Sequence, residues 1–339
     1  MTQNSIFILL YATIALASCQ KKETEKLSSN NLIASSNATL SSEFFRYYYK
    51  GSSNNNYNVY SGKSNNGINW TSSLINNGET TQGSPAATVF NGAIYEFHRG
   101  KTNNNLYYTY SADRGDSWAP AVVLGNNAST SGDASACTFG GRMFLAYPSP
   151  TFVLGNNSTP IYYSYSSDGQ NWTEVSLPYT SYGDPFIFTF GYGINILYCS
   201  TLTPAPAFTI LSSSNGITWT KGSQLNFGFF RYSAAAQINP TPPNSIAATI
   251  IGMDLDGQLK TTFSYDLVNW TTPAQIKTAS GQLAYTSRRP SISPTGSVAI
   301  YKAKTNTNII YALPSADRYI EKANANGTTN ESPYLIEVP

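Results

Sequence analysis

Two aspartates and two arginines recur at similar intervals along the chain, and their side chains could act together on one ligand. Asp133, Asp184, Arg231 and Arg289 each open a strand-like run, and they lie 47 to 58 residues apart. Paired carboxylates can divide proton transfer, one as base or nucleophile and the other as general acid. A guanidinium fork binds an oxyanion through two hydrogen bonds. These residue types therefore predict a site for a polar or acidic ligand, if the fold brings them together.

The elements that would position these side chains are repeats, each marked by a tryptophan. All five tryptophans close the same short motif, and the copies begin 47 to 55 residues apart. The leading residues of the copies are Ser64, Ser111, Ser166, Ser213 and Ser264, and an incomplete sixth copy begins at Ser315. One turn motif per period of about 50 residues is typical of a repeat architecture.

Each copy of the motif is predicted to form a tight turn between two strands. Its Asp or Asn can accept backbone hydrogen bonds, and the glycine that follows in four copies adopts a positive φ at low cost. Leu267 takes that place in the fifth copy, where we expect a different or strained turn. The tryptophan offers a large apolar face to a neighbouring unit. The predicted structural pairs are Asn66 with Trp70, Asp113 with Trp118, Asp168 with Trp172, Asn215 with Trp219, and Asp266 with Trp270.

Each period contains about four short strands. Runs with alternating aromatic and β-branched residues, such as 106–110 and 161–165, are separated by Asn, Gly and Pro clusters. This pattern predicts an all-β, six-bladed propeller of four-stranded antiparallel blades, at about 32–83, 84–132, 133–183, 184–230, 231–286 and 287–339. The strand-like tail 332–339 could complete the last blade or pair with the first. Residues 32–40 compete as the inner strand of the first blade.

The motif Ser-x-Asp-x-Gly-x-x-Trp resembles the Asp-box, or BNR repeat, of sialidases and related propellers. The copy at Ser111 has the full eight-residue spacing, and the other four copies are one residue shorter. Five copies, extended by the period, cover nearly all of the chain after its leader. The resemblance implies that the boxes lie on the hairpins between third and fourth strands, away from the ligand mouth, and that their tryptophans are structural.

The starts of the innermost strands line the central opening of a propeller, so aligned positions at these starts predict the site. The aligned residues are Ser84, Asp133, Asp184, Arg231 and Arg289. Our predicted ligand-binding residues are Arg231, Arg289, Asp133, Asp184, Arg288 and Tyr232. Neighbours on a strand face opposite ways, so the Arg288–Arg289 pair could supply only one side chain to the opening. Alternatively, the aspartates form ion pairs with Arg231 or Arg289 that tie the blades together.

Two resemblances bear on catalysis, and neither is complete. Arg231 and Arg289 match the second and third arginines of the sialidase triad, but the motif that carries the first is absent and only Arg46 could replace it. The opening Gly-Asp-Pro-Phe at 183–186 resembles arabinanase-like and invertase-like propellers, without their third-blade glutamate. Candidate catalytic residues are Asp133, Asp184 and Tyr311. A binding protein without the full catalytic set is therefore favoured, with a glycoside hydrolase and a protein-binding scaffold as alternatives.

The first residues predict export. Residues 1–18 have the apolar pattern of a signal peptide, and Leu-Ala-Ser-Cys at 16–19 matches a bacterial lipobox, which predicts lipidation of Cys19. Residues 19–31 are polar and predict a flexible tether, and 32–339 form the propeller. We therefore expect a lipoprotein held by its anchor at the outer membrane or cell surface of a bacterium.

Composition limits the remaining function classes. One histidine and no CxxC pair argue against a zinc site and against Ser-His-Asp chemistry, so we expect neither metal nor cofactor. The formal charge of +2, without a basic stripe, argues against nucleic acid as a partner. The abundance of Asn, Ser, Thr and Tyr suits contacts with sugars, and we expect a glycan or glycoconjugate as the partner. Cys137 and Cys199 are either buried thiols or a disulfide. Glu96, His98 and Arg99 share one strand and suggest a solvated edge.

Overall fold

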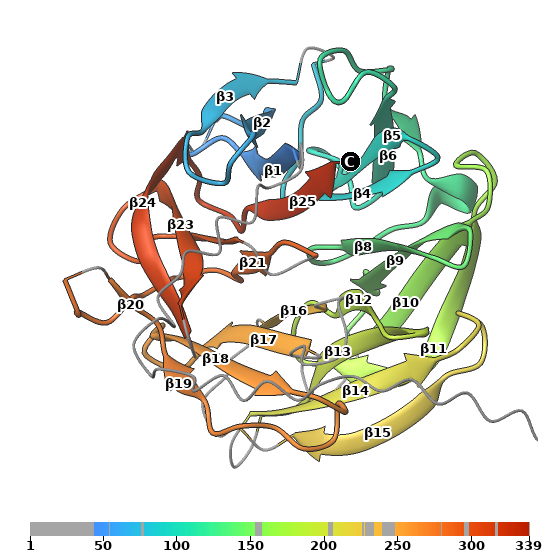
Figure 1. The fold of residues 1–339 in the computed structure, drawn as a ribbon. Coiled ribbons are helices and arrows are strands. Elements are labelled where there is room, and N and C mark those ends of the chain that lie inside the picture. The colour runs from blue at the N-terminus through green and yellow to red at the C-terminus, as the bar shows by residue number, and fades with distance from the viewer. Residues whose placement is uncertain are drawn as a thin grey trace, which may run out of the picture. The chain divides into compact units, whose positions relative to one another are not determined.

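The described residues of the computed structural model are 44–53, 55–75, 78–152, 158–202, 206–225, 227, 234–238, 248–278, 280–294, 298–315 and 318–338. They form six small sheets around a central axis, as Figure 1 shows, and the fold is the predicted six-bladed β-propeller. The leader with Cys19 lies outside the described residues, as do Arg231 and Tyr232.

The first three blades are four-stranded and antiparallel, and their strands are given from the axis outward. Blade 1 consists of β25 (Tyr334–Val338), β1 (Phe44–Lys50), β2 (Val59–Ser64) and β3 (Thr71–Leu74). Blade 2 consists of β4 (Ala86–Phe90), β5 (Ala93–Arg99), β6 (Leu106–Ser111) and β7 (Val122–Val123), followed by the 3-10 turn η1 (Gly125–Asn127). Blade 3 consists of β8 (Ser135–Phe139), β9 (Arg142–Pro148), β10 (Thr159–Ser166) and β11 (Thr173–Ser181).

The last three blades follow the same plan, with one addition. Blade 4 consists of β12 (Phe186–Phe190), β13 (Gly193–Thr201), β14 (Ala207–Ser213) and β15 (Thr220–Leu225). Blade 5 consists of β16 (Ala234–Ile238), β17 (Ala248–Met253), β18 (Leu259–Ser264) and β19 (Ala274–Gln275). Blade 6 consists of β21 (Ser291–Ile292), β22 (Ala299–Lys302), β23 (Asn308–Ser315) and β24 (Arg318–Thr328), and β20 (Lys277–Thr278) pairs in parallel with β24.

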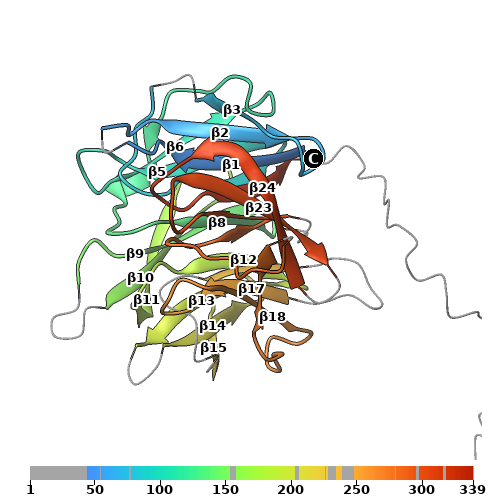
Figure 2. The ribbon, with the colours of Figure 1, turned by 90° about the vertical axis from the view of Figure 1, so that its left-hand side faces the viewer.

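The C-terminal strand closes the ring. β25 pairs antiparallel with β1, with Arg46 opposite Ile336, so the tail completes the first blade and not the last. This pairing decides between the two places that the sequence allowed for the tail. Each innermost strand then contacts the innermost strand of the next blade, and β25 lies between β21 and β4. The first and last segments of the described chain are thereby joined in one sheet. Figure 2 shows the propeller from the side, with β1, β2 and β3 of this blade.

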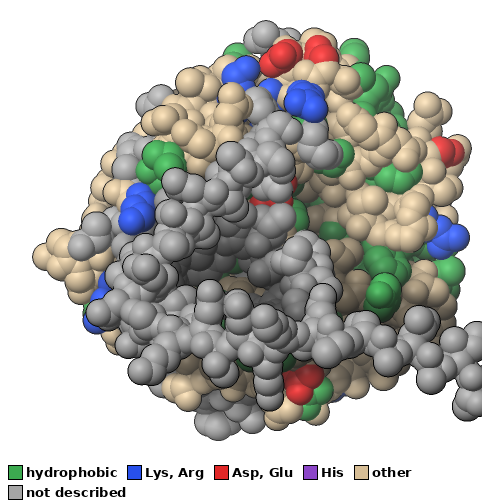
Figure 3. All heavy atoms as spheres, in the orientation of Figure 1, with side chains coloured by type: hydrophobic (Ala, Val, Ile, Leu, Met, Phe, Trp, Pro, Cys, Tyr) green, Lys and Arg blue, Asp and Glu red, His purple; other side chains and the backbone are tan. Residues whose placement is uncertain are grey.

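The strand directions give the propeller two different faces. All innermost strands begin at one face, which we call the strand-start face, and end at the other, the strand-end face. Because the strands of each blade alternate in direction, the turn between third and fourth strands lies at the strand-end face. The five tryptophan motifs are these turns. Figure 3 views the strand-end face, where the visible charged side chains are few and scattered.

The turn at Asp168 shows how the motif folds. Asp168 Oδ1 accepts hydrogen bonds from the N–H groups of Gln170 and Asn171, both at 2.8 Å. Gly169 has a φ of 79°, and a Cβ there would overlap the Tyr95 ring of the preceding blade. Glycine is thus required twice, for the left-handed backbone and for the close approach of the neighbouring blade.

Leu267 forms the same turn without glycine. Its φ is 61°, and its carbonyl accepts the Trp270 Nε1–H at 3.1 Å, as the Gly67 carbonyl accepts that of Trp70. The turn is therefore not a different one. Leu267 therefore adopts a left-handed backbone conformation, which costs residues other than glycine about 1–2 kcal/mol.

Each tryptophan packs against an aromatic ring of the preceding blade. The ring centroids lie 5.5 to 6.4 Å apart in these contacts. The pairs are Trp70 with Tyr311, Trp118 with Tyr48, Trp172 with Phe97, Trp219 with Tyr163, and Trp270 with Phe227. The core therefore lies between blades, and the turns at the rim fasten each blade to the one before it.

The two cysteines of the propeller are free thiols, Cys137 on β8 and Cys199 on β13. Cys199 is buried and Cys137 is half-buried, and the two are not joined in a disulfide. Within the described ranges, no helix has the length and apolarity needed to span a membrane.

Candidate functional site

Five of the innermost strands follow the same four-residue turn at the strand-start face. The side-chain oxygen of its first residue accepts the N–H of its third residue at 3.0 to 3.3 Å. The turns begin at Thr81, Thr130, Ser181, Thr286 and Thr329. We call their fourth residues the inner ring, and these are Ser84, Asp133, Asp184, Arg289 and Ser332. The fifth blade's equivalent segment lies outside the described residues.

The inner ring links neighbouring blades through backbone amides. The N–H of Ser332 donates to Ser84 Oγ at 2.9 Å, and the N–H of Ser84 donates to Asp133 Oδ1 at 2.8 Å. The N–H of Asp133 donates in turn to Asp184 Oδ1 at 3.0 Å. The aspartates therefore tie the blades together, which is the role that the sequence analysis gave as the alternative to ligand binding. Their partners are backbone amides, and the described residues show no ion pair for either carboxylate.

The third residue of the turn is small where the next blade supplies an aspartate. A Cβ on Gly132 would overlap the Asp184 carboxylate, and one on Gly83 would come 2.5 Å from Asp133 Oδ1. Where the next blade supplies a serine, there is room for a large side chain. Arg288 and Glu331 occupy the third position in these two turns.

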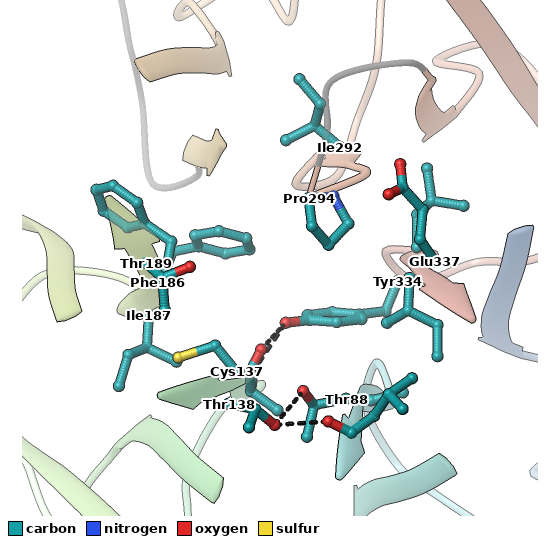
Figure 4. Close-up of a pocket in the computed structure, with 16 residues that line it drawn as sticks. Thr88, Cys137, Thr138, Phe186, Ile187, Thr189, Ile292, Pro294, Tyr334 and Glu337 are labelled. Atoms are coloured by element: carbon teal, nitrogen blue, oxygen red, sulfur yellow. Dashed lines mark hydrogen bonds between the residues drawn. The ribbon is translucent and has the colours of Figure 1, made fainter. Parts of the chain in front are cut away.

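Buried side chains fill the centre of the strand-start face. Arg289 is 3% exposed, and its Nη2 donates to the Ala134 carbonyl of the opposite blade at 3.1 Å. The Tyr334 hydroxyl accepts the Ala136 N–H at 2.9 Å and donates to the Ala136 carbonyl at 2.8 Å, as Figure 4 shows. Phe186 packs between them, 5.7 Å from the Arg289 guanidinium. Arg289 is thus engaged across the axis through Nη2, while its buried Nη1 has no hydrogen-bond partner among the described residues.

A cavity of about 240 Å³ lies within the central channel. Side chains of the innermost strands line it, among them Thr88, Thr138, Ile292 and Glu337, with Tyr334 at the strand-start end (Figure 4). Its lining mixes hydroxyl groups with apolar surface and holds one carboxylate.

Asp184 is a weaker acid than an ordinary aspartate. Burial and the neighbouring Asp133 carboxylate raise its pKa to about 7, although the Arg289 guanidinium acts in the opposite direction. The two carboxylates are therefore close enough to repel each other, which disfavours two negative charges at the centre.

The remaining predicted residues lie elsewhere. Tyr311 is on β23, the third strand of blade 6, where it is buried against Trp70 and does not join the inner ring. Arg46 lies on β1, the second strand of blade 1, and donates to Ser61 Oγ at 3.1 Å. Arg231 and Tyr232 fall outside the described residues, so their roles stay predictions.

An open cleft lies beside the inner ring, where blade 6 meets blade 1. We call it the closure cleft, and its volume is about 540 Å³. It is lined by Lys50, Tyr57, Ser287, Arg288, Lys302, Asn330 and Glu331. Arg288 Nε donates to the Asn330 carbonyl at 2.7 Å and lies 3.3 Å from Glu331 Oε2. The cleft exists only in the closed ring, because Lys50 and Tyr57 come from the start of the propeller and the rest from its end.

The sequence makes Arg288 a candidate for the central opening; the structure places it in this cleft, with partners that the sequence analysis did not name. Lys50, Tyr57, Lys302 and Glu331 carry no motif of their own. The missed signal is the repeated turn itself, since Thr329 to Ser332 form the same turn as Thr286 to Arg289 and each segment opens with threonine. An alignment of the turns would have placed Glu331, the third residue of its turn, beside Arg288, the third residue of the neighbouring turn.

A buried charged triad replaces the solvated edge expected around His98. His98 Nδ1 lies 2.9 Å from Glu96 Oε2, and His98 Nε2 lies 3.4 Å from Glu79 Oε2. Burial lowers the pKa of His98, but the two carboxylates outweigh it and raise the value to about 9. The edge prediction was wrong because β5 lies between β4 and β6. In the described ranges, no group of three or more potential ligand side chains is arranged to hold a metal.

Comparisons with known proteins give a likeness of fold. No family model matches the chain, and no curated protein matches it. A mutant of Aleuria aurantia lectin, in complex with Fucalpha1-6GlcNAc, aligns at a TM-score of 0.60 and 16% identity over 85% of this chain and 94% of that one. SapL1 lectin, in complex with alpha methyl fucoside, gives 0.56 and 12% over 84% and 96%. AofleA from Arthrobotrys oligospora gives 0.56 and 11% over 82% of each chain.

The fold and its neighbours define the class. The chain is a six-bladed β-propeller of the architecture found in these lectins. At such identities the likeness extends to the fold and not to individual binding residues.

Proposed function

We propose that this protein binds carbohydrate and holds its ligand in the closure cleft, at the edge of the central mouth. The observation that carries the proposal is the open polar cleft around Arg288 and Glu331. A guanidinium, a carboxylate and an amide beside one another can satisfy the paired donors and acceptors of sugar hydroxyls. Two neighbours of the same fold are lectins in complex with fucose-containing ligands, which supports a sugar as the ligand class.

Binding without turnover accounts best for the inner ring. Asp133 and Asp184 accept backbone amides of the neighbouring blades, and Arg289 is buried across the axis. Groups with such structural tasks are poorly placed to receive a substrate. The hydrogen bonds of the tryptophan turns support their assignment as Asp-box repeats of a sialidase-like propeller, in which these turns serve the scaffold.

Hydrolysis is the second candidate, and one observation favours it. The raised pKa of Asp184 beside a second carboxylate is the property that a general acid requires. Turnover of an aryl sialoside or arabinoside, lost in Asp184→Asn, would support this alternative.

We also propose that the protein is an exported lipoprotein anchored through Cys19 at the cell surface. β1 begins at the strand-end face, because it runs antiparallel to β25. The closure cleft lies at the other face, the strand-start face. Labelled fatty acid incorporated by the wild type and not by Cys19→Ala would test the anchor.

A glycan array tests the binding proposal. The soluble propeller should retain a defined set of glycans, and Arg288→Ala should lose at least tenfold in retention, since charge-assisted hydrogen bonds are removed. Lys221→Ala, on the exposed strand β15, is the matched control and should bind as the wild type does. If Arg231→Ala lost glycan retention and Arg288→Ala did not, the ligand would be assigned to the central mouth instead of the closure cleft. No retained glycan would overturn the proposal.

A further inference from the structure

The closure cleft gathers cations in a chain that is close to neutral overall. The whole sequence has 20 Lys and Arg against 18 Asp and Glu. The cleft lining has three cationic side chains, Lys50, Arg288 and Lys302, against the one carboxylate of Glu331. Lys101 of the next blade adds a fourth cation at the border, with its Nζ 4.5 Å from the centre of the Tyr57 ring.

Tyr57 gathers two of these cations. The Lys50 Nζ lies 5.4 Å from the same ring centre, so one aromatic ring attracts two ammonium groups from two blades. Such cation–π contacts stabilise each charge and position it beside the cleft. Lys50 is buried, so packing holds this cation in place, whereas Lys101 is exposed.

The cations differ in the donors that they keep for a ligand. Lys302 Nζ donates to Ser287 Oγ at 2.9 Å and to the carbonyls of Ala303 and Asn306 at 3.0 Å each. An ammonium has three donors, so Lys302 contributes charge but no further hydrogen bond. Arg288 uses Nε on Asn330, and no partner is found for its terminal nitrogens among the described residues. The same part of the chain shows no hydrogen bond for Lys50 Nζ.

The single carboxylate leaves the cleft positive. Burial and Asp133 raise the pKa of Glu331, and burial together with the nearby Arg288 lowers the pKa of Lys302. The lowered pKa of Lys302 shows that its charge is opposed by its surroundings, and a bound anion would relieve that opposition.

We infer that the ligand of the closure cleft is an acidic saccharide. Its carboxylate or sulfate group is bound by Lys50 Nζ and the terminal nitrogens of Arg288, and Lys302 contributes positive charge without a hydrogen bond to the ligand. The inference rests on the proposed function and deepens it. It places anion recognition between the first and last blades, on residues other than the inner-ring arginine.

Titration calorimetry with three oligosaccharides of equal length tests the inference. A uronic acid oligomer, a sulfated neutral oligomer and its unsulfated parent distinguish the two sources of the oxyanion. We expect one or both acidic oligomers to bind at least tenfold more tightly than the parent at low salt. This advantage should shrink as salt rises, because the contacts are partly exposed.

Variants locate the contact. Lys50→Gln and Arg288→Gln should each weaken the acidic ligand about tenfold and reduce its salt dependence, while Lys221→Gln leaves both unchanged. Because the Lys50 stem is buried, thermal unfolding must show that Lys50→Gln is folded; Arg288 is half-exposed and serves as the second variant. Equal affinity for the neutral parent, without salt dependence, would overturn the inference and leave the proposed function intact. Failure of all three oligomers in the wild type would overturn the inference, and the proposed function would fall with it only if the glycan array also showed no retained glycan.

Discussion

Asp184 combines a structural contact with an unusual acidity. Its carboxylate accepts the Asp133 N–H, and burial beside the Asp133 carboxylate raises its pKa to about 7. A protonated carboxyl keeps one oxygen for that hydrogen bond and removes the repulsion between the two side chains. The neutral form is therefore compatible with the role of Asp184 between blades 3 and 4.

The pH dependence of stability should report this acidity. The folded protein keeps the proton up to about pH 7, whereas the unfolded chain releases it near the ordinary pKa of 3.8. The contribution of the Asp184 carboxyl to the free energy of unfolding is thus complete below pH 3.8 and is lost as the pH rises through 7. Urea unfolding between pH 4.5 and 8 should show a steeper decline for the wild type than for Asp184→Asn. Parallel curves would contradict the raised pKa. His98, whose pKa the neighbouring carboxylates raise to about 9, is present in both proteins and does not affect the comparison.

The sequence predicted the residues of the inner ring better than their roles. A fixed repeat sets the position of each strand start, so Asp133, Asp184 and Arg289 could be placed at one opening from spacing alone. The reach of Arg289 to the opposite blade, and the use of both aspartates by backbone amides, depend on contacts between distant segments. No local pattern records such contacts.

The tryptophan turn is the element that repeats most faithfully. Its hydrogen bonds are local, between the Asx side chain and the next few amides, which is why the sequence predicted the turn so well. At Leu267 the sequence allowed either a different or a strained turn, and the structure has the strained one. The packing of Trp270 on Phe227 holds the turn in place, and the strain falls on the leucine instead.

Glycine substitutions separate backbone strain from crowding. Gly216 and Gly281 both have positive φ, but only at Gly216 would a Cβ overlap a neighbour, the ring of Phe144. Gly281→Ala should cost about 1 kcal/mol of the free energy of unfolding, and Gly216→Ala about 2–4 kcal/mol. Leu267→Gly should be neutral or stabilising. Urea denaturation measures all three, and equal losses for the two alanine variants would refute the crowding argument.

Ring closure is the feature of the whole molecule that the sequence left open. The tail could pair at either end of the chain, because a short strand-like segment carries no signal for its partner. The structure pairs it with β1, and this pairing brings Glu331 of the last connection next to the first blade. The closure cleft could not be predicted before the closure itself was known.

Removal of β25 should therefore abolish both folding and binding. Tyr334, Leu335, Ile336 and Val338 are all buried, and without them β1 loses its inner partner. A chain ending at Ser332 should lose its cooperative thermal transition and its near-ultraviolet circular dichroism, while deletion of Pro339 alone should change neither. A cooperative transition in the shortened chain would show that the ring is stable without its last strand.

The location of a bound saccharide tests the central claim most directly. A crystal structure of the propeller with the tightest-binding acidic oligosaccharide should show the acidic group between Lys50 and Arg288, in the cleft where the last blade meets the first. Saccharide density over Asp133 and Asp184, or inside the central channel, with the closure cleft empty, would contradict the account.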